Sequence, residues 1–174
     1  ATRYRDLGYW QGITLTDLLA QAIRRAPDKT ALVHGSERIA YRALGEAVDR
    51  LACGFFDAGI RPLDRVVVQL PNIPEFIYTY FALARIGAIP VTALRAHRHT
   101  EVAHFLRASG AVAYVIPDAI KDFDYRAMAQ ELAPFGVRIA LVEPGITGTD
   151  MAVSNLPKPL ADSAYPHGGR LVAL

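Results

Sequence analysis

The sequence alternates short apolar runs with longer stretches of helical periodicity. Residues 66–70, 89–94, 113–116 and 137–142 are almost uninterrupted apolar runs, as expected of strands that are covered on both faces. Stretches of about a dozen residues with one apolar side separate them, and helices of that length connect parallel strands. We therefore expect an α/β fold with a mainly parallel sheet and helices on both of its faces.

The first part of the chain predicts a helix followed by a β-hairpin. Thr14 and Asp17 are spaced as a short-armed capping box at the start of a helix. The extended runs 30–34 and 38–41 are joined by Gly35-Ser36, which favours a tight turn between two strands. A second helix is expected from about residue 43.

Three further helices are expected between the predicted strands, and the tail has no clear period. Their ranges are 74–86, 99–110 and 125–135, and the first begins with Pro74 at a favourable position. Past Pro144 the periodicity fades, and prolines and glycines become frequent. This composition predicts a partly irregular C-terminal segment.

Length, charge and cysteine content narrow the class of protein. The chain has 174 residues, of which 52% are hydrophobic, enough to bury the core of one domain. Nineteen basic and seventeen acidic residues leave a net charge of +2, which gives no electrostatic reason to expect nucleic acid as a partner.

The single cysteine, Cys53, cannot form an internal disulfide and is expected to be a small core residue. A reducing, cytoplasmic location follows from this.

Neither a signal peptide nor a membrane span is expected. Residues 1–12 mix charged and aromatic side chains and contain no apolar core segment. Residues 76–94 are apolar enough to resemble a membrane span, but Arg85, Gly87 and Pro90 interrupt them. A helix followed by a buried strand explains this stretch, and no membrane partner is expected.

Most of the chain carries a family resemblance. Five segments taken in their order and spacing carry it: residues 4–10, 39–44, 64–76, 87–91 continuing through 96–98, and 113–118 followed by 123–126. Together, residues 1 to about 130 resemble part of the N-terminal domain of adenylate-forming ligases. The particular branch is the aryl-acid–AMP ligases of siderophore synthesis, which activate 2,3-dihydroxybenzoate or salicylate.

The resemblance implies a reaction but assigns no catalytic residue. An aryl acid and ATP would give an acyl-adenylate and pyrophosphate, and the acyl group would pass to a carrier-protein thiol. The family's loop ending in Pro-Lys, its aromatic-pocket motifs and its lid lysine lie beyond the matched region. ATP and magnesium are therefore implied while their binding motifs are missing. Whether the chain is an enzyme stays open, and it is expected to be inactive without the remainder of such a ligase.

A loop near the end does not replace the missing one. Residues 145–149 are rich in Gly and Thr, but Asp150 and Met151 stand where Pro-Lys would follow. We do not expect this loop to hold a triphosphate.

The C-terminal segment has a second resemblance. Residues 131–145, with Thr149 and residues 163–167, resemble the end of a short-chain dehydrogenase/reductase. In that family the residues matching Pro144, Gly145 and Thr149 contact NAD(P), so these three are the candidate cofactor-binding residues.

The remaining dehydrogenase machinery is absent from the sequence. There is no Gly-rich dinucleotide loop and no Tyr followed four positions later by Lys. We expect a ligase-like segment over residues 1–130 and a dehydrogenase-like segment over 131–174, packed on the same sheet. An NAD(P) binder and a folded, non-catalytic chimera are the alternatives. Natural fusion, gene remnant, sequence-assembly error and engineered recombinant stay open as origins.

Other polar and aromatic residues have simpler structural explanations. His97, His99 and His104 cluster, but the last two are five residues apart and do not share a helical face, so no metal site is expected. Glu75 follows Pro74 at a helix start, where a carboxylate interacts favourably with the helix dipole. Tyr9 and Trp10 are expected to pack the N-terminal arm on the domain.

Overall fold

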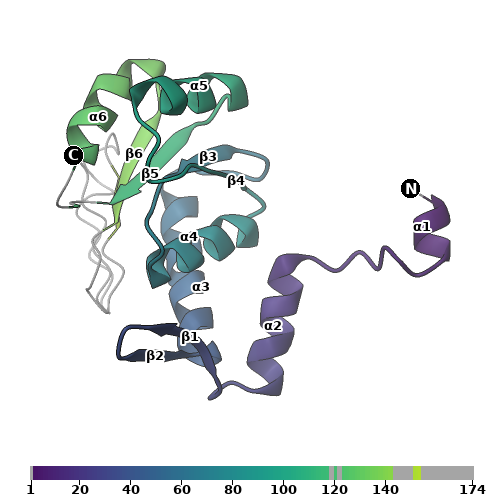
Figure 1. Ribbon diagram of the computed structural model, residues 1–174. Helices are drawn as coiled ribbons and strands as arrows, with labels where there is room; N and C mark the ends of the chain where they lie inside the picture. The colour runs from purple at the N-terminus through teal and green to yellow at the C-terminus, as the bar shows by residue number, and fades with distance from the viewer. Residues whose placement is uncertain (1, 118–119, 121–122, 143–150, 154–174) are drawn as a thin grey trace. The chain divides into compact units, whose positions relative to one another are not determined.

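The computed structural model describes residues 2–117, 120, 123–142 and 151–153 (Figure 1). The chain falls into two compact units, Ala1–Gly45 and Glu46–Leu174. Helix α3 (Tyr41–Asp57) begins in the first unit and ends in the second.

The first unit contains the predicted helix and hairpin. Helix α2 (Leu15–Arg25) begins with the predicted capping box, in which the Asp17 N–H donates to Thr14 Oγ1 at 3.1 Å and the Thr14 N–H donates to Asp17 Oδ2 at 2.9 Å. The hydrogen bonds from Thr14 lower the pKa of the Asp17 carboxyl. Strands β1 (Thr30–His34) and β2 (Glu37–Ala40) pair in antiparallel fashion, which confirms the hairpin.

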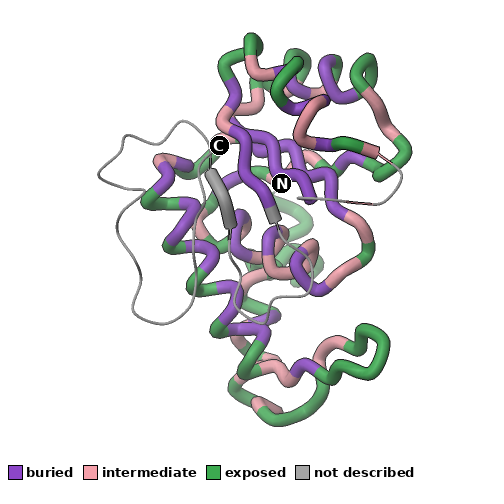
Figure 2. The backbone as a smooth tube through the Cα atoms, turned by 90° about the vertical axis from the view of Figure 1, so that its left-hand side faces the viewer, coloured by how far each residue is buried: buried purple, intermediate pink, exposed green. Residues whose placement is uncertain are grey.

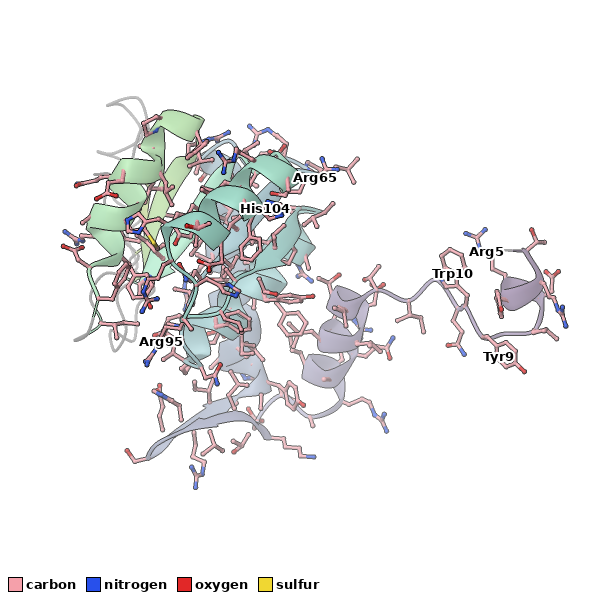
Figure 3. The ribbon with its side chains drawn as sticks, turned by 45° about the horizontal axis from the view of Figure 1, so that its top comes forward. Arg5, Tyr9, Trp10, Arg65, Arg95 and His104 are labelled. Carbon is pink, nitrogen blue, oxygen red and sulfur yellow. The ribbon has the colours of Figure 1, made fainter. Side chains whose placement is uncertain are left out.

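The N-terminal arm contains a short helix that the sequence did not predict. Helix α1 spans Thr2–Asp6, and the Arg5 guanidinium lies 4.8 Å from the centre of the Trp10 ring (Figure 3). Tyr9 and Trp10 are exposed. Their packing on the domain stays a prediction.

The second unit is built on a sheet with the strand order β4-β3-β5-β6-β7. The first four strands are parallel to one another and the last pairs in antiparallel fashion with β6. This confirms the predicted mainly parallel sheet, whereas the last strand was not predicted. The strands are β3 (Arg65–Val68), β4 (Ile89–Thr92), β5 (Ala113–Pro117), β6 (Arg138–Val142) and β7 (Met151–Val153).

Helices cover both faces of this sheet, as the apolar strands predicted. Figure 1 shows α3 and α4 (Pro74–Arg85) on one side of the strands and α5 (His99–Ser109) and α6 (Tyr125–Leu132) on the other. A short 3-10 helix (Ala133–Phe135) follows α6.

Alternate residues of β3 belong to two separate hydrophobic cores. Val66 and Val68 pack with residues of α3 and α4, and Val67 packs with residues of α5 and α6. All three are completely buried, because successive side chains of a strand point to opposite faces and both faces are covered. Figure 2 shows buried residues gathered in the middle of the second unit, with exposed residues mostly around them.

The edge strand β4 contains a proline. Pro90 stands opposite Val66 of β3 in the parallel register. Among the described strands, β4 has a neighbour on one side only, and proline, which lacks a backbone N–H, is accommodated in such a strand.

The apolar stretch 76–94 forms α4 and then β4, as predicted. None of the described helices combines the length and the apolar character that crossing a membrane requires.

The prediction that Cys53 is a core residue was wrong. Its side chain is exposed on α3. The buried positions of that helix include Leu51, Ala52 and Phe55, and Cys53 projects from a different side of the same helix.

The C-terminus of α3 is closed by backbone and side-chain hydrogen bonds. The Ile60 N–H donates to the Phe55 carbonyl at 3.0 Å and the Gly59 N–H to the Phe56 carbonyl at 3.0 Å, which is a Schellman motif. Gly59 has φ +85°, a conformation that favours glycine. The Arg138 guanidinium, from β6, donates to the Ala58 carbonyl. A cation at this end of a helix also interacts favourably with the helix dipole.

We predict that Arg138→Met destabilises the chain by about 1–3 kcal/mol, because the carbonyl of the buried residue Ala58 loses a charged donor. Arg85→Met is the matched control, since Arg85 pairs with Asp49 on the surface with side chains 44% and 56% exposed. It should cost at most about 1 kcal/mol. Urea unfolding of both variants measures the difference, and equal losses would contradict the capping role.

A second prediction concerns Thr79, on α4. Its side chain is 0% exposed, and Oγ1 has no hydrogen-bond partner among the described residues. Burying an unpaired hydroxyl costs about 1–3 kcal/mol. Thr79→Val, which replaces the hydroxyl by a methyl group, should therefore raise the urea midpoint. A lower midpoint would show that the hydroxyl has a stabilising partner.

Candidate functional site

The order of the strands indicates where a ligand site would lie. The chain passes from β3 outward to β4 and then returns across β3 to β5, so the direction of winding reverses beside β3. In open α/β sheets, ligands bind outside the carboxyl ends of the strands at such a reversal. This reversal lies between β3 and β5, so the segment that follows β3 borders such a site.

A groove lies at this edge of the sheet. Its volume is about 510 Å³, and it is bounded by the start of α4 and by the segments that follow β3 and β4. The lining residues are Leu70, Pro71, Asn72, Phe76, Thr92, Ala93, Leu94 and Arg95.

The groove combines an apolar wall with a few polar groups. Asn72 supplies an amide, Thr92 a hydroxyl and Arg95 a guanidinium, and all three residues are exposed. Ligand sites are typically apolar with a small number of polar groups that fix orientation. The groove therefore suits a ligand with an apolar body and an anionic or hydrogen-bond-accepting group.

A turn formed by residues 93–98 builds one wall of the groove. The His97 N–H donates to the Leu94 carbonyl at 3.0 Å, and the Leu94 N–H donates to His97 Nδ1 at 3.1 Å. The turn leads directly into α5, where the Arg98 N–H donates to Glu101 Oε2 at 3.0 Å. This bond lowers the pKa of the Glu101 carboxyl.

Buried polar side chains hold the turn from inside. Gln69 Nε2 donates to the carbonyls of Leu94 and His97, at 2.8 Å and 3.0 Å. Gln69 Oε1 accepts from the Tyr114 hydroxyl. The Tyr125 hydroxyl donates to the Arg95 carbonyl at 2.9 Å. Burial raises the pKa of Tyr114 far above its usual value, so its hydroxyl stays protonated and can donate.

Arg98 contributes to the same turn. Its Nη1 donates to the carbonyls of Arg95 and His97, at 2.7 Å and 2.9 Å, and its guanidinium lies 4.1 Å from the centre of the Phe123 ring. The guanidinium thereby joins the turn to the segment that precedes α6.

The three histidines of the sequence cluster have separate surroundings. His97 accepts a hydrogen bond within the turn, His99 pairs with Glu131 at 2.9 Å, and the ring centre of His104 lies 6.1 Å from that of Phe105. Across the described residues, no three His, Cys, Asp or Glu side chains are arranged to hold a metal ion.

Glu75 stands in the first turn of α4, as predicted for a carboxylate that interacts with the helix dipole. It is 8% exposed.

The candidate NAD(P)-binding residues Pro144, Gly145 and Thr149 lie outside the described residues, as does the loop 145–149. Their role stays a prediction. The residues that line the groove offer Arg95 and Asn72 to an anion but no carboxylate to a magnesium ion, so they do not by themselves fit ATP–Mg.

Sequence reasoning missed the groove and the residues behind it. One signal was present, since Gln69 is a polar residue within the apolar run 66–70. A polar side chain in a fully buried strand must find hydrogen-bond partners, so such a residue indicates a buried network.

Comparison with known proteins places the chain in a family. The model of the AMP-binding enzymes matches residues 19–159, which include every residue that lines the groove. Triostin synthetase I of Streptomyces triostinicus is 51% identical over 142 residues, which are 82% of this chain and 27% of that protein. The 2,3-dihydroxybenzoate-AMP ligase of Bacillus subtilis is 47% identical over 132 residues, 76% of this chain and 24% of the ligase.

A solved structure supports the same assignment. The apo structure of MbtA from Mycobacterium smegmatis aligns with a TM-score of 0.72 and 32% identity, over 88% of this chain and 35% of that one. The chain thus spans about a quarter of the length of the curated relatives that it matches.

The dehydrogenase resemblance of the tail gains no support from these comparisons. The AMP-binding match runs without a change of family across residue 130, to residue 159. The division into segments 1–130 and 131–174 stays a prediction. On the residues matched and the identities found, the chain belongs to the family of AMP-binding enzymes.

Proposed function

We propose that this chain is part of an enzyme that activates an aryl acid, such as 2,3-dihydroxybenzoate or salicylate, as its acyl-adenylate. The observation that supports this most is the 47% identity to a 2,3-dihydroxybenzoate-AMP ligase over 132 residues. The carboxylate of the acid would attack the α-phosphorus of ATP, and pyrophosphate would leave. Adenylation before acyl transfer in siderophore synthesis is the pathway role that the family resemblance implies.

The part of the reaction that these residues would serve is binding. The groove has an apolar wall and one guanidinium, and it lies at the edge of the sheet where α/β enzymes bind ligands. The groups that act on the triphosphate would come from other parts of the enzyme. The chain alone is therefore proposed to be inactive and to need the remainder of the ligase.

The partners and location follow from the same proposal. The partners would be the aryl acid, ATP with magnesium, and a carrier protein whose thiol accepts the acyl group. The cytoplasm is the proposed location, since the reaction consumes ATP.

A hybrid enzyme tests the proposal. We predict that the Bacillus subtilis ligase keeps ATP–pyrophosphate exchange when its matched quarter is replaced by the 132 corresponding residues of this chain. The rate with 2,3-dihydroxybenzoate or salicylate should stay within about tenfold of the parent, since a correctly folded replacement leaves the reacting groups in place.

Octanoate is the control acid, and residues 1–174 alone are the control protein; neither should support exchange. A hybrid that unfolds cooperatively but exchanges with no aryl acid would contradict the proposal.

The role of the groove can be tested in the same hybrid with two arginines. Arg95 lines the groove, whereas Arg65 begins β3 at the opposite edge of the sheet (Figure 3). We predict that Arg95→Ala raises one of three KM values, that of the acid, of ATP or of the carrier protein, by about tenfold. The kcat should change little, because binding is lost equally in the ground state and the transition state.

Arg65→Ala is the matched control and should leave all three KM values within about twofold. Unchanged KM values for Arg95→Ala would show that the groove does not contact a substrate.

A further inference from the structure

The side chain of Gln69 is completely buried, and all of its hydrogen-bonding groups are used. Its amide has two N–H donors and one oxygen acceptor. The donors reach the carbonyls of Leu94 and His97, and the oxygen accepts from the Tyr114 hydroxyl. A buried polar network in which every member is satisfied makes one structure specific.

The orientation of the Gln69 amide is fixed by its partners. The carbonyls of Leu94 and His97 can only accept, so the amide nitrogen must face the turn. The oxygen then faces Tyr114, whose hydroxyl must donate. A flipped amide would set the oxygen against two carbonyls, so the network permits one arrangement.

This arrangement determines what the turn presents to the groove. The carbonyls of residues 94, 95 and 97 all accept side-chain hydrogen bonds. The side chains of Leu94 and Arg95 are exposed and line the groove. The position of the Arg95 guanidinium therefore depends on Gln69 at the end of β3, which Tyr114 of β5 orients, and on Tyr125 of α6.

We propose that Gln69 is a positioning residue, which holds the turn 93–98 in the conformation that sets Arg95 on the wall of the groove. The effect on substrate binding rests on the proposed function, whereas the effect on the turn does not. The effect on the turn and the effect on substrate binding are therefore tested by two independent measurements.

Hydrogen exchange of residues 1–174 tests the effect on the turn. In Gln69→Leu, the amides of Leu94 and His97 should exchange about ten to a hundred times faster, since two hydrogen bonds to the turn are lost. The backbone amide at position 69, which donates to the Val115 carbonyl within the sheet, should keep an exchange rate within about twofold of the parent. Equal acceleration in turn and sheet, or none in the turn, would overturn the proposal.

Two tyrosine variants keep this test decisive if Gln69→Leu does not fold. Tyr125→Phe removes only the bond to the Arg95 carbonyl and should accelerate exchange in the turn by a smaller factor. Tyr80→Phe is the control, since the Tyr80 ring packs beside Phe76 and Phe81 on α4. Acceleration in the turn by the control, or none by Tyr125→Phe, would count against the positioning network.

A double-mutant cycle in the hybrid ligase tests the effect on binding. Gln69→Leu should raise the same KM as Arg95→Ala, with kcat within about twofold. Gln69→Leu combined with Arg95→Ala should be no worse than Arg95→Ala alone, because one residue acts through the other. Additive effects would overturn positioning through Arg95. A silent Arg95→Ala would refute the groove's substrate role and this binding effect, while hydrogen exchange still decides the effect on the turn.

Discussion

Strand β3 is the element on which the second unit depends. It has hydrogen-bonded neighbours on both sides, and its successive side chains enter two different cores. Val66 and Val68 pack in the core that contains residues of α3 and α4. Val67 packs in the core that contains residues of α5 and α6. A polar residue within this strand would leave an unpaired group in one of the two cores. At the end of the strand, Gln69 is tolerated because its amide is fully hydrogen-bonded.

The periodicity of the sequence predicted most of the fold. Apolar runs predicted the four parallel strands, and the stretches between them predicted α4, α5 and α6 to within a few residues. Strand β7 was missed because its three residues are too few for a two-residue period to be recognised. Helix α1 was missed because it is a five-residue helix with no buried side, so it leaves no apolar pattern.

The site was harder to predict because its contacts are distant in sequence. Gln69 is 25 residues from Leu94 and 45 from Tyr114, and no local spacing rule connects them. The fourth segment of the family resemblance consists of residues 87–91 and 96–98, so Arg95 is not among the residues that carried it. A residue that lines a groove through its side chain alone, without a motif around it, becomes visible only when the strands are placed side by side.

The double resemblance of the sequence has a physical explanation. A helix, a glycine and an apolar strand form a unit that recurs in many unrelated α/β proteins. The unit recurs because it lets the apolar side of the helix pack on the face of the sheet. Residues 125–142 are such a unit, with Gly136 at φ +73° between helix and strand. In this fold the unit contacts the rest of the sheet domain directly. Strand β6 pairs with β5, and Arg138 donates a hydrogen bond to the Ala58 carbonyl at the C-terminal end of α3.

Pro90 has a consequence for how the molecule behaves in a crowded solution. Among the described strands, β4 forms one border of the sheet, and its central proline offers no N–H to an approaching chain. A second molecule therefore cannot add a continuous ladder of hydrogen bonds along this border. The sheet is protected there against the edge-to-edge polymerisation to which flat, apolar strands are prone.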